Sequence, residues 1–513
     1  MLSHDEPSYG CCALKMLLDH NYIVPKYYFE ETILADKPPL FPWLIAYSYK
    51  VFGISDFASR IPSAFSAILL VLFTWYIGKK ILGTKTGLIS AFILASSVEY
   101  LFLGRRAATD IVFCLFFSSS LYSMYMSYFN KKPKVKICWM ILSGTFAGLA
   151  LLTKGPVGIL LQFLILTIFL IFKKQINIKH IKIYLIIGLV ALIVSLPWYI
   201  AVHISTNGEF TKSFFFTQNI ERFISVVGKH PGAFWFYLPI LLLGFMPWTL
   251  FLIPALYDFL KHLRNKNFNS FTLFCLVWFS VIFIFFSFSK TKLATYILLA
   301  FPPISLISGY WLCILERKQL EAIKRTFLFL LLTIILLSPL SYFIITKSKF
   351  SLVDKNTFLS QILLSVGFFI VGSIMMMFPK KIHTLTISFI ASFTLPAVFL
   401  LTSFLTIYYK YTFADLRDYA ILAHKMNAKE IISFGTFHPI IPYYSKTPTD
   451  FNVSKKGQIK KMYNLLIRDH KVFIIGHLAD IKKNNLIIKQ NESLFKRLHI
   501  VKLSKKYFFG VIT

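Results

Sequence analysis

The sequence contains few acidic residues, and this shortage is its most informative feature. Only 22 of its 513 residues are Asp or Glu, against 55 Lys and Arg, which gives a formal net charge of +33. In addition, 56% of the residues are hydrophobic and the mean hydropathy is +0.66, so a soluble protein could not bury this much apolar surface. We therefore predict a membrane protein. Its basic excess is typical of loops that fix topology rather than of nucleic-acid binding.

Cysteine and nucleotide-binding motifs are also missing. The six cysteines include the adjacent Cys11 and Cys12, which are poorly placed for a mutual disulfide, and the sequence has no CxxC or His/Cys metal-ligand spacing. The other cysteines fall in or beside apolar runs and are interpreted as small apolar residues. The sequence indicates no cofactor with certainty, and a divalent metal stays open.

Hydrophobic runs long enough to cross a bilayer recur between residues 61 and 408. We predict about twelve spans of roughly 17–25 residues each. They are Ile61–Leu82, Thr86–Leu103, Ile111–Phe129, Ile137–Leu152, Val157–Phe172, Ile183–Val202, Phe236–Phe259, Phe271–Phe288, Leu293–Leu315, Phe327–Ile345, Phe358–Phe378 and Leu385–Tyr408.

Basic residues gather in alternate loops between these spans, for example in residues 131–136 and 173–182. The positive-inside rule makes this set of loops cytoplasmic. The opposite face then receives the N-terminal segment, the Asp110 loop, the loop of residues 203–235 and the tail from Lys410 onward. Because the polar motifs all fall on that face, the topology predicts one extracytoplasmic site.

Three segments are predicted along the chain. Residues 1–60 form an extracytoplasmic catalytic segment, residues 61–408 the membrane domain, and residues 409–513 a small extracytoplasmic α/β domain. In the last segment a helix-like stretch, Ala414–Met426, precedes strand-sized runs at Glu430–Phe434 and Lys471–Gly476. No apolar run precedes residues 1–60 to carry them across the membrane. We therefore expect the true start upstream, with one further apolar helix.

Two acidic motifs precede the first predicted span. DEPSY at residues 5–9 suits the first turn of a helix, where acids complement the helix dipole, or supplies a general base at the water–lipid boundary. In DKPPL at residues 36–40 the prolines stiffen the backbone and would hold Asp36 and Lys37 at a defined position. The alternative for the second motif is a surface turn with a weak salt bridge.

Arginines stand beside a further acid at the heads of two spans. Arg60 either anchors its span at the interface or holds a phosphate with its guanidinium fork, and Arg105 and Arg106 pose the same choice. Asp110 follows them at the start of an apolar helix, where a carboxylate is costly and is a functional candidate by default. An N-cap or a salt bridge with those arginines would also explain it.

Two other lysines lie where spans begin or end. Lys154 opens the break KGPVG, in which glycines allow close approach of a ligand and the next helix offers free N–H groups to an anion. A plain hairpin between helices is the alternative. Lys292, four residues before Tyr296, again places a cation at the outer end of a span.

The order of these motifs resembles a known family. DExxY at 5–9, DKPPL at 36–40, Arg60, the segment 105–110, TKGPVG at 153–158, Pro247-Trp248 and KLxxYIL at 292–298 are similar to the bacterial branch of the dolichyl-phosphate-mannose protein mannosyltransferases, which includes the lipid A aminoarabinose transferases. The resemblance covers about residues 1–310. It implies a polytopic helical C-type glycosyltransferase fold, commonly with about thirteen spans, which agrees with one more span upstream.

The resemblance also implies roles for individual residues. Asp5 becomes a candidate base and Asp110 the second catalytic acid, while Lys37, Arg60 and Lys292 become candidate phosphate holders. The aminoarabinose branch has Glu where this chain has Asp36, which weakens the transfer of a metal role to that position. The remaining residues expected at the substrate are Glu6, Asp36, Arg105, Lys154 and Tyr296.

The expected activity is the transfer of a sugar from a polyprenyl-phosphate donor to an envelope acceptor. Lipid A is narrowly favoured over another glycan or a protein, so a protein O-mannosyltransferase of the same fold is an alternative. A polysaccharide ligase would use the same face. A secondary transporter would place ionisable residues near the bilayer midplane and show internal repeats. The other partners expected are membrane lipids, with no nucleic acid.

Overall fold

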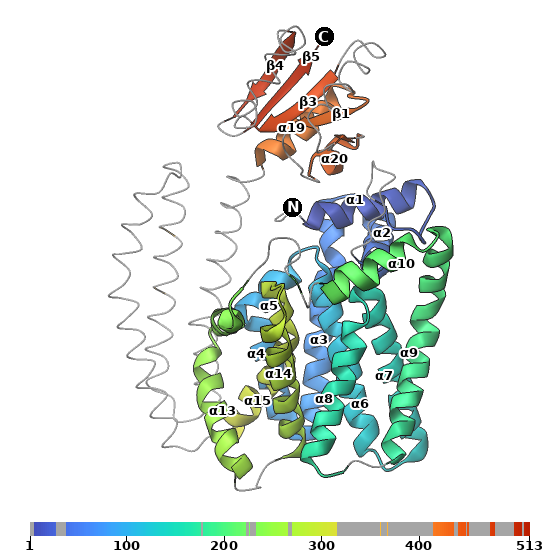
Figure 1. The fold of residues 1–513 in the computed structure, drawn as a ribbon. Helices are drawn as coiled ribbons and strands as arrows, with labels where there is room; N and C mark the ends of the chain where they lie inside the picture. Colours follow the sequence, from blue (N-terminus) through green and yellow to red (C-terminus); the bar gives the residue numbers. More distant parts are fainter. Residues whose placement is uncertain are drawn as a thin grey trace. The chain divides into compact units, whose positions relative to one another are not determined.

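The computed structural model describes residues 5–26, 37–175, 178–221, 225, 232–264, 269–314, 360, 367, 414–434, 440–447, 449–450, 472–477, 497–504 and 507–512 (Figure 1). Two compact units are present. Unit 1 comprises residues 1–35, 41–61 and 406–513, and unit 2 comprises residues 36–40 and 62–405. The predicted segment 409–513 and most of the predicted segment 1–60 therefore belong to unit 1, whereas residues 36–40 belong to unit 2. The predicted spans Phe327–Ile345, Phe358–Phe378 and Leu385–Tyr408 lie outside the described residues, except for positions 360 and 367.

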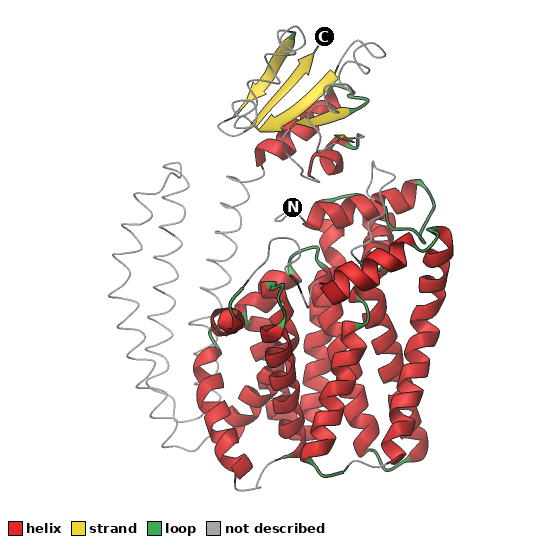
Figure 2. Ribbon diagram, viewed as in Figure 1, coloured by secondary structure: helices red, strands yellow, loops and turns green. Residues whose placement is uncertain are grey.

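Apolar helices dominate the described part of residues 56–314 (Figure 2). Six helical segments there are long and apolar enough to cross a bilayer, and α8 (Val157–Phe172) is a shorter apolar helix. Each overlaps a predicted span. The six are α3 (Asp56–Leu82), α6 (Thr109–Phe129), α7 (Pro133–Lys154), α9 (Ile178–Ser205), α14 (Ser270–Phe288), and η3 (Ala294–Ala300) running into α15 (Phe301–Ile314).

Two spans predicted as continuous are broken, so this expectation was wrong for Thr86–Leu103 and Phe236–Phe259. In the first, α4 (Thr84–Ser96) and α5 (Val98–Gly104) meet at 67°. In the second, η2 (Phe234–Phe236) and α12 (Tyr237–Gly244) meet α13 (Thr249–Arg264) at 117°.

Hydrogen bonds between the two breaks explain them. The Val98 amide donates to the Met246 carbonyl at 3.1 Å, and Trp248 Nε1 donates to Ser96 Oγ at 2.8 Å. The Ser97 hydroxyl donates to the carbonyl four residues earlier, which competes with helix continuation. Each break thus provides hydrogen-bond partners for the other. Backbone groups that lose their partner within a helix can in this way still be hydrogen-bonded inside a membrane.

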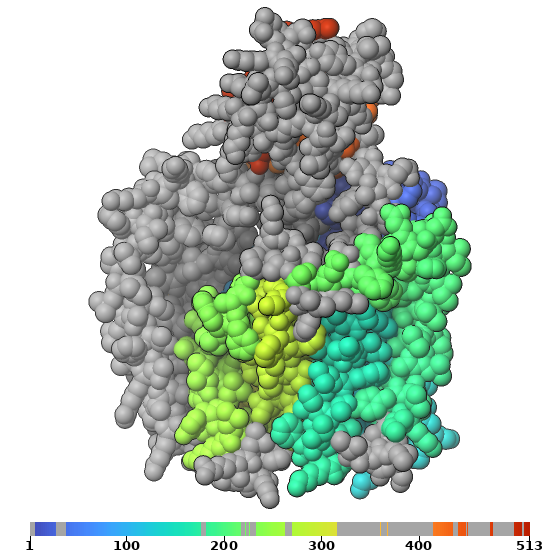
Figure 3. Space-filling view, viewed as in Figure 1, coloured from blue at the N-terminus to red at the C-terminus, as the bar shows by residue number. Residues whose placement is uncertain are grey.

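Small residues bring the helices of unit 2 close together. At Gly144 and Gly148 of α7, an added Cβ would lie 2.6 Å and 2.7 Å from the Cβ atoms of Val190 and Val194 on α9. This is the packing expected where no hydrophobic force acts between helices in lipid. Figure 3 shows α14 (yellow) beside α8 (teal), and these two helices are in contact. After α9 follow α10 (Glu209–Lys212) and the π-helix η1 (Ser213–Glu221).

Unit 1 combines helices with a five-stranded sheet. Its helices are α1 (Asp5–Leu18), α2 (Leu40–Phe52), α19 (Ala414–Lys425) and α20 (Ile440–Ser445). Its strands are β1 (Ile431–Phe434), β2 (Thr449–Asp450), β3 (Val472–His477), β4 (Leu498–Leu503) and β5 (Tyr507–Ile512).

The sheet has the order β2-β1-β3-β5-β4. Strand β1 pairs in parallel with β2 and β3, whereas β5 pairs antiparallel with β3 and β4. Leu416 and Tyr419 of α19 pack with Ile431, Phe473 and Phe509 in a buried core. The helix α19 and the strands β1 and β3 overlap the runs that the sequence predicted.

Candidate active site

The clearest polar centre of unit 2 is an ion pair at the start of α6. Asp110 is the second residue of that helix, and its Oδ1 lies 2.6 Å from Nζ of Lys154, the last residue of α7. The two side chains are only 14% and 16% exposed. Gly155, with φ 94°, ends α7 and lets α8 begin two residues later. The predicted break at KGPVG is therefore a tight turn that presents Lys154.

Aromatic rings surround this ion pair. The Lys154 ammonium lies 5.4 Å from the ring centroids of both Phe113 and Tyr296, a cation–π geometry. Asp110, Lys154 and Tyr296, three residues predicted separately from motifs far apart in the sequence, thus meet at one place.

The two alternatives considered for Asp110 are wrong. The helix N-cap is Ala108, which makes no side-chain cap, and the ion-pair partner of Asp110 is Lys154 rather than an arginine. Arg105 is exposed, and the guanidinium carbon of Arg106 lies 5.1 Å from the Phe102 ring centroid. The reason is geometric, since the turn at Gly155 brings the end of α7 to the start of α6.

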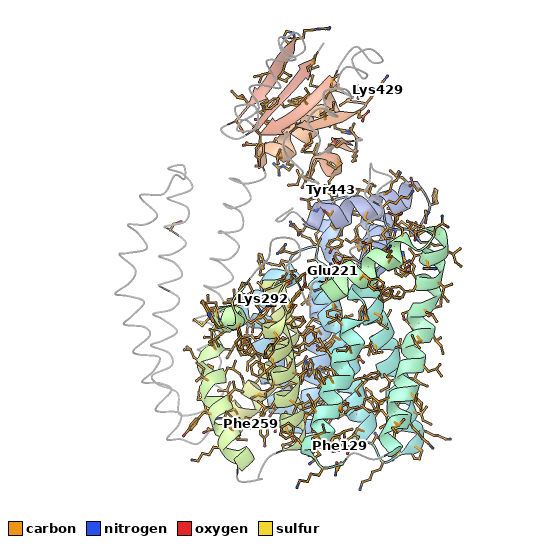
Figure 4. The ribbon with its side chains drawn as sticks, viewed as in Figure 1. Phe129, Glu221, Phe259, Lys292, Lys429 and Tyr443 are labelled. Atoms are coloured by element: carbon orange, nitrogen blue, oxygen red, sulfur yellow. The ribbon has the colours of Figure 1, made fainter. Side chains whose placement is uncertain are left out.

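The side chain of Lys292 is buried, and its ammonium group is bonded to backbone carbonyl oxygens (Figure 4). Its ammonium donates to the carbonyls of Phe286 (3.3 Å), Ser287 (2.7 Å) and Ser289 (2.9 Å), and it lies 5.5 Å from the Tyr237 ring centroid. An ammonium has three protons, so this arrangement caps the C-terminal end of α14. Burial, and secondarily the charge of Lys290, lowers the pKa of Lys292.

A second centre lies within unit 1, between α1 and the start of α3. Glu6 is fully buried at 0% side-chain exposure, and Arg60 donates to both of its carboxylate oxygens, from Nε at 3.2 Å and from Nη2 at 3.3 Å. This is the bidentate fork that the sequence suggested for a phosphate. In the structure this guanidinium fork binds Glu6 instead. Asp5 is the first residue of α1, as the helix-start interpretation of DEPSY expected.

The DKPPL motif is only partly described. Lys37 is partly buried and precedes Pro38 and Pro39, which lead directly into α2, whereas Asp36 lies outside the described residues. The side chain of Asp5 is likewise outside them. In the described ranges no three His, Cys, Asp or Glu side chains are grouped closely enough to hold a metal ion.

Tyrosines that the sequence analysis missed tie α20 to the first turn of α3. The Tyr444 hydroxyl donates to Asp56 at 2.6 Å. Three hydroxyls form a closed cluster, with Tyr49 and Ser59 2.7 Å apart, Tyr443 and Ser59 3.2 Å apart, and Tyr49 donating to Tyr443 at 3.3 Å. Burial is the main cause that raises the pKa of Tyr49 and of Tyr443.

Removing one hydroxyl from this cluster should weaken unit 1. We expect Tyr443→Phe to lower the free energy of unfolding by about 1 kcal/mol, because it leaves the buried Tyr49 and Ser59 hydroxyls with fewer partners. Thermal unfolding of the purified chain measures the loss. Tyr47→Phe is the matched control, since Tyr47 is 69% exposed. Equal stability of both variants would contradict the prediction.

Comparison with known proteins shows which family the chain resembles. A family model described as dolichyl-phosphate-mannose-protein mannosyltransferase matches residues 36–200. An undecaprenyl phosphate-alpha-4-amino-4-deoxy-L-arabinose arabinosyl transferase of Shewanella sediminis is 30% identical over 305 residues, 60% of this chain and 54% of that protein. The chain is therefore similar to the dolichyl-phosphate-mannose-protein mannosyltransferase family, as the order of its sequence motifs predicted.

Other comparisons extend this result. An arabinosyl transferase of the same description from Proteus mirabilis is 30% identical over 370 residues, 71% of this chain and 65% of that protein. The alignments thus span about half to two thirds of these curated relatives. The crystal structure of ArnT from Cupriavidus metallidurans bound to undecaprenyl phosphate has a TM-score of 0.85 at 17% identity, covering 100% of this chain and 94% of that one.

These matches bear on the predicted fold and site. The helical membrane fold is confirmed at the level of a fold shared with ArnT and several apolar spans. The family model covers Lys37, Arg60, Asp110 and Lys154, so both partners of the ion pair in unit 2 fall within it. Glu6, Lys292 and Tyr296 lie beyond its bounds.

Proposed function

We propose that this chain is an integral membrane glycosyltransferase that moves a sugar from a polyprenyl-phosphate donor to an envelope acceptor, with lipid A favoured. The observation that carries the proposal is the Asp110–Lys154 pair with Tyr296 beside it, at the ends of apolar helices. The names of the curated relatives support a lipid-phosphate donor and suggest 4-amino-4-deoxy-L-arabinose as the first sugar to test.

The proposed reaction needs only proton transfer and charge stabilisation. A carboxylate accepts the proton of the acceptor hydroxyl, whose oxygen forms a bond to the anomeric carbon of the sugar. The bond from that carbon to the phosphate oxygen breaks, and the electron pair leaves with the polyprenyl phosphate. A fixed ammonium close to the departing phosphate stabilises the negative charge that develops on it. Asp110 and Lys154 supply these two chemistries side by side.

The remaining predicted site residues take supporting roles in this proposal. Asp5 is a second proton acceptor, and Lys37, Arg60 and Lys292 are phosphate contacts, for which Arg60 and Lys292 would exchange the partners that they hold in this structure. Glu6, Asp36 and Arg105 complete the substrate-binding set. The protein would lie in a bacterial inner membrane with about twelve or thirteen spans. Its site and its C-terminal α/β region would face the periplasm.

The proposal is tested by reconstituting the purified chain in vesicles with a polyprenyl-phosphate aminoarabinose donor and lipid A. Mass spectrometry should show lipid A with the added sugar and free polyprenyl phosphate in equal amounts. Glycosylated peptide with unmodified lipid A would support a protein O-mannosyltransferase instead. Movement of donor across the vesicle wall with no new glycosidic bond would support a transporter and refute the proposal.

A further inference from the structure

One acidic side chain in unit 2 has a buried oxygen atom without a hydrogen-bond partner in the described structure. Glu99 is the second residue of α5, and its Oε2 atom is buried with no hydrogen bond in the part of the chain that the structure describes. Other buried or partly buried acids there are satisfied, since Asp110 bonds to Lys154 and Asp258 accepts from Trp311. A carboxylate left alone in an apolar helix costs several kcal/mol, so an intramembrane acid calls for a named partner.

The fold holds Glu99 tightly in place. On α12, Gly244 faces it so closely that an added Cβ would lie 2.9 Å from the Cβ of Glu99 and would collide with its Oε2. The backbone on either side is fixed as well, because the Val98 amide bonds to Met246 across the two helix breaks. Because Gly244 has no side chain, the Glu99 carboxylate can pack directly against α12.

The charges around Glu99 indicate which kind of partner its carboxylate lacks. Glu99 interacts electrostatically with Asp110, so two carboxylates share this region of the unit. Lys154 is bonded to one of them, Asp110, and Arg106 also interacts electrostatically with Asp110. No Lys, Arg or His forms an ion pair with Glu99 among the described residues, and its Oε2 has no hydrogen bond there. A ligand that brings an ammonium group to Glu99 would give its Oε2 a charged hydrogen-bond donor, whereas a neutral sugar would not.

We infer that Glu99 binds the ammonium group of an amino sugar carried by the lipid donor, and so selects an amino-sugar donor over a neutral one. This inference rests on the proposed function, and it adds a specificity residue to it. Glu99 is suited to the role because it interacts electrostatically with Asp110 but takes no part in the Asp110–Lys154 pair. The ammonium of the sugar would take the place of the partner that the protein does not supply.

The test compares two donors that differ by one charge. One is polyprenyl-phosphate 4-amino-4-deoxyarabinose, and the other is the same lipid with its amine formylated and therefore neutral. For Glu99→Gln we expect kcat/KM with the amine donor to fall at least about 30-fold, the lower end for breaking a buried charge pair. With the neutral donor it should change less than about 3-fold. Equal losses with both donors, or no loss with either, would overturn the inference.

A second variant perturbs the same carboxylate without changing its charge. Gly244→Ala places a methyl group against Oε2 and should reduce the preference for the amine donor in the same direction. Gly188→Ala is the matched control, because an added Cβ at Gly188 meets only Phe163 at 4.0 Å. A loss of preference in the control as large as in Gly244→Ala would argue for a general packing effect and against the inference.

Binding measurements separate this inference from the proposed function. Equilibrium binding of both lipids to the wild type and to Glu99→Gln is measured in the same detergent, together with thermal unfolding. If the wild-type protein transfers neither sugar, the proposed function is refuted. The role of Glu99 is still supported if the wild type binds the amine lipid more tightly than the neutral one and Glu99→Gln loses this difference. Lower thermal stability of Glu99→Gln with unchanged selectivity would show a purely structural role and overturn the inference.

Discussion

Asp110→Asn is expected to lower kcat at least about 10²-fold, the usual contribution of a general base. The amide keeps the size of the carboxylate but cannot accept a proton from the acceptor hydroxyl. It also leaves Lys154 without its ion pair at 2.6 Å, so the ammonium that faces Phe113 and Tyr296 loses the group that positions it. Steady-state transfer to lipid A, measured over a range of donor concentrations, gives kcat and KM separately.

Two comparisons make this result specific to the site. Asp418→Asn is the matched control, since Asp418 has 44% side-chain exposure and pairs with the neighbouring Arg417 on the same helix of unit 1. Its activity should equal that of the wild type. Asp110→Glu keeps a carboxylate and should recover part of the rate. An Asp110→Asn variant with near-normal kcat would remove this residue from the chemistry and leave the Asp110–Lys154 pair with a structural role.

Much of the membrane architecture could be predicted from hydropathy alone. Helices such as α6, α7 and α14 lie within a few residues of the predicted spans because each is a continuous apolar run of sufficient length. The breaks at Ser97 and near Met246 could not be predicted, since they depend on bonds between two distant segments. A serine inside an apolar run is compatible with a straight helix until a neighbour offers the freed amide a partner.

For the site as well, local sequence patterns predicted candidate residues but not which of them pair. A carboxylate at the head of an apolar helix and a lysine before glycine singled out Asp110 and Lys154 separately. Their pairing follows from how α6 and α7 pack, which no local pattern contains. Glu99 was passed over inside an apolar run, although a lone acid there is itself a signal. Tyr443 and Tyr444 carried no signal, because their value comes from α3 residues far away in the sequence.

The Glu6–Arg60 pair should be the main electrostatic support of α1 within unit 1. We expect Glu6→Gln to lower the free energy of unfolding by about 2 kcal/mol, below the range for a fully buried pair because Arg60 is 28% exposed and keeps some hydration. The amide of Gln offers one acceptor oxygen where the carboxylate offered two, so one Arg60 donor loses its bond. Thermal unfolding of the purified chain measures the change.

A double-mutant cycle shows whether that loss belongs to the pair itself. Arg60→Met removes the cation while it keeps much of the side-chain length, and combining it with Glu6→Gln should cost less than the sum of the two single variants. Glu209→Gln is the control, because Glu209 is exposed on α10 and should have no measurable effect. Strict additivity would contradict a direct interaction. Coupling of about 1 kcal/mol or more would establish that burial of Glu6 is sustained by the Arg60 fork, because an isolated carboxylate at 0% exposure would be strongly destabilising.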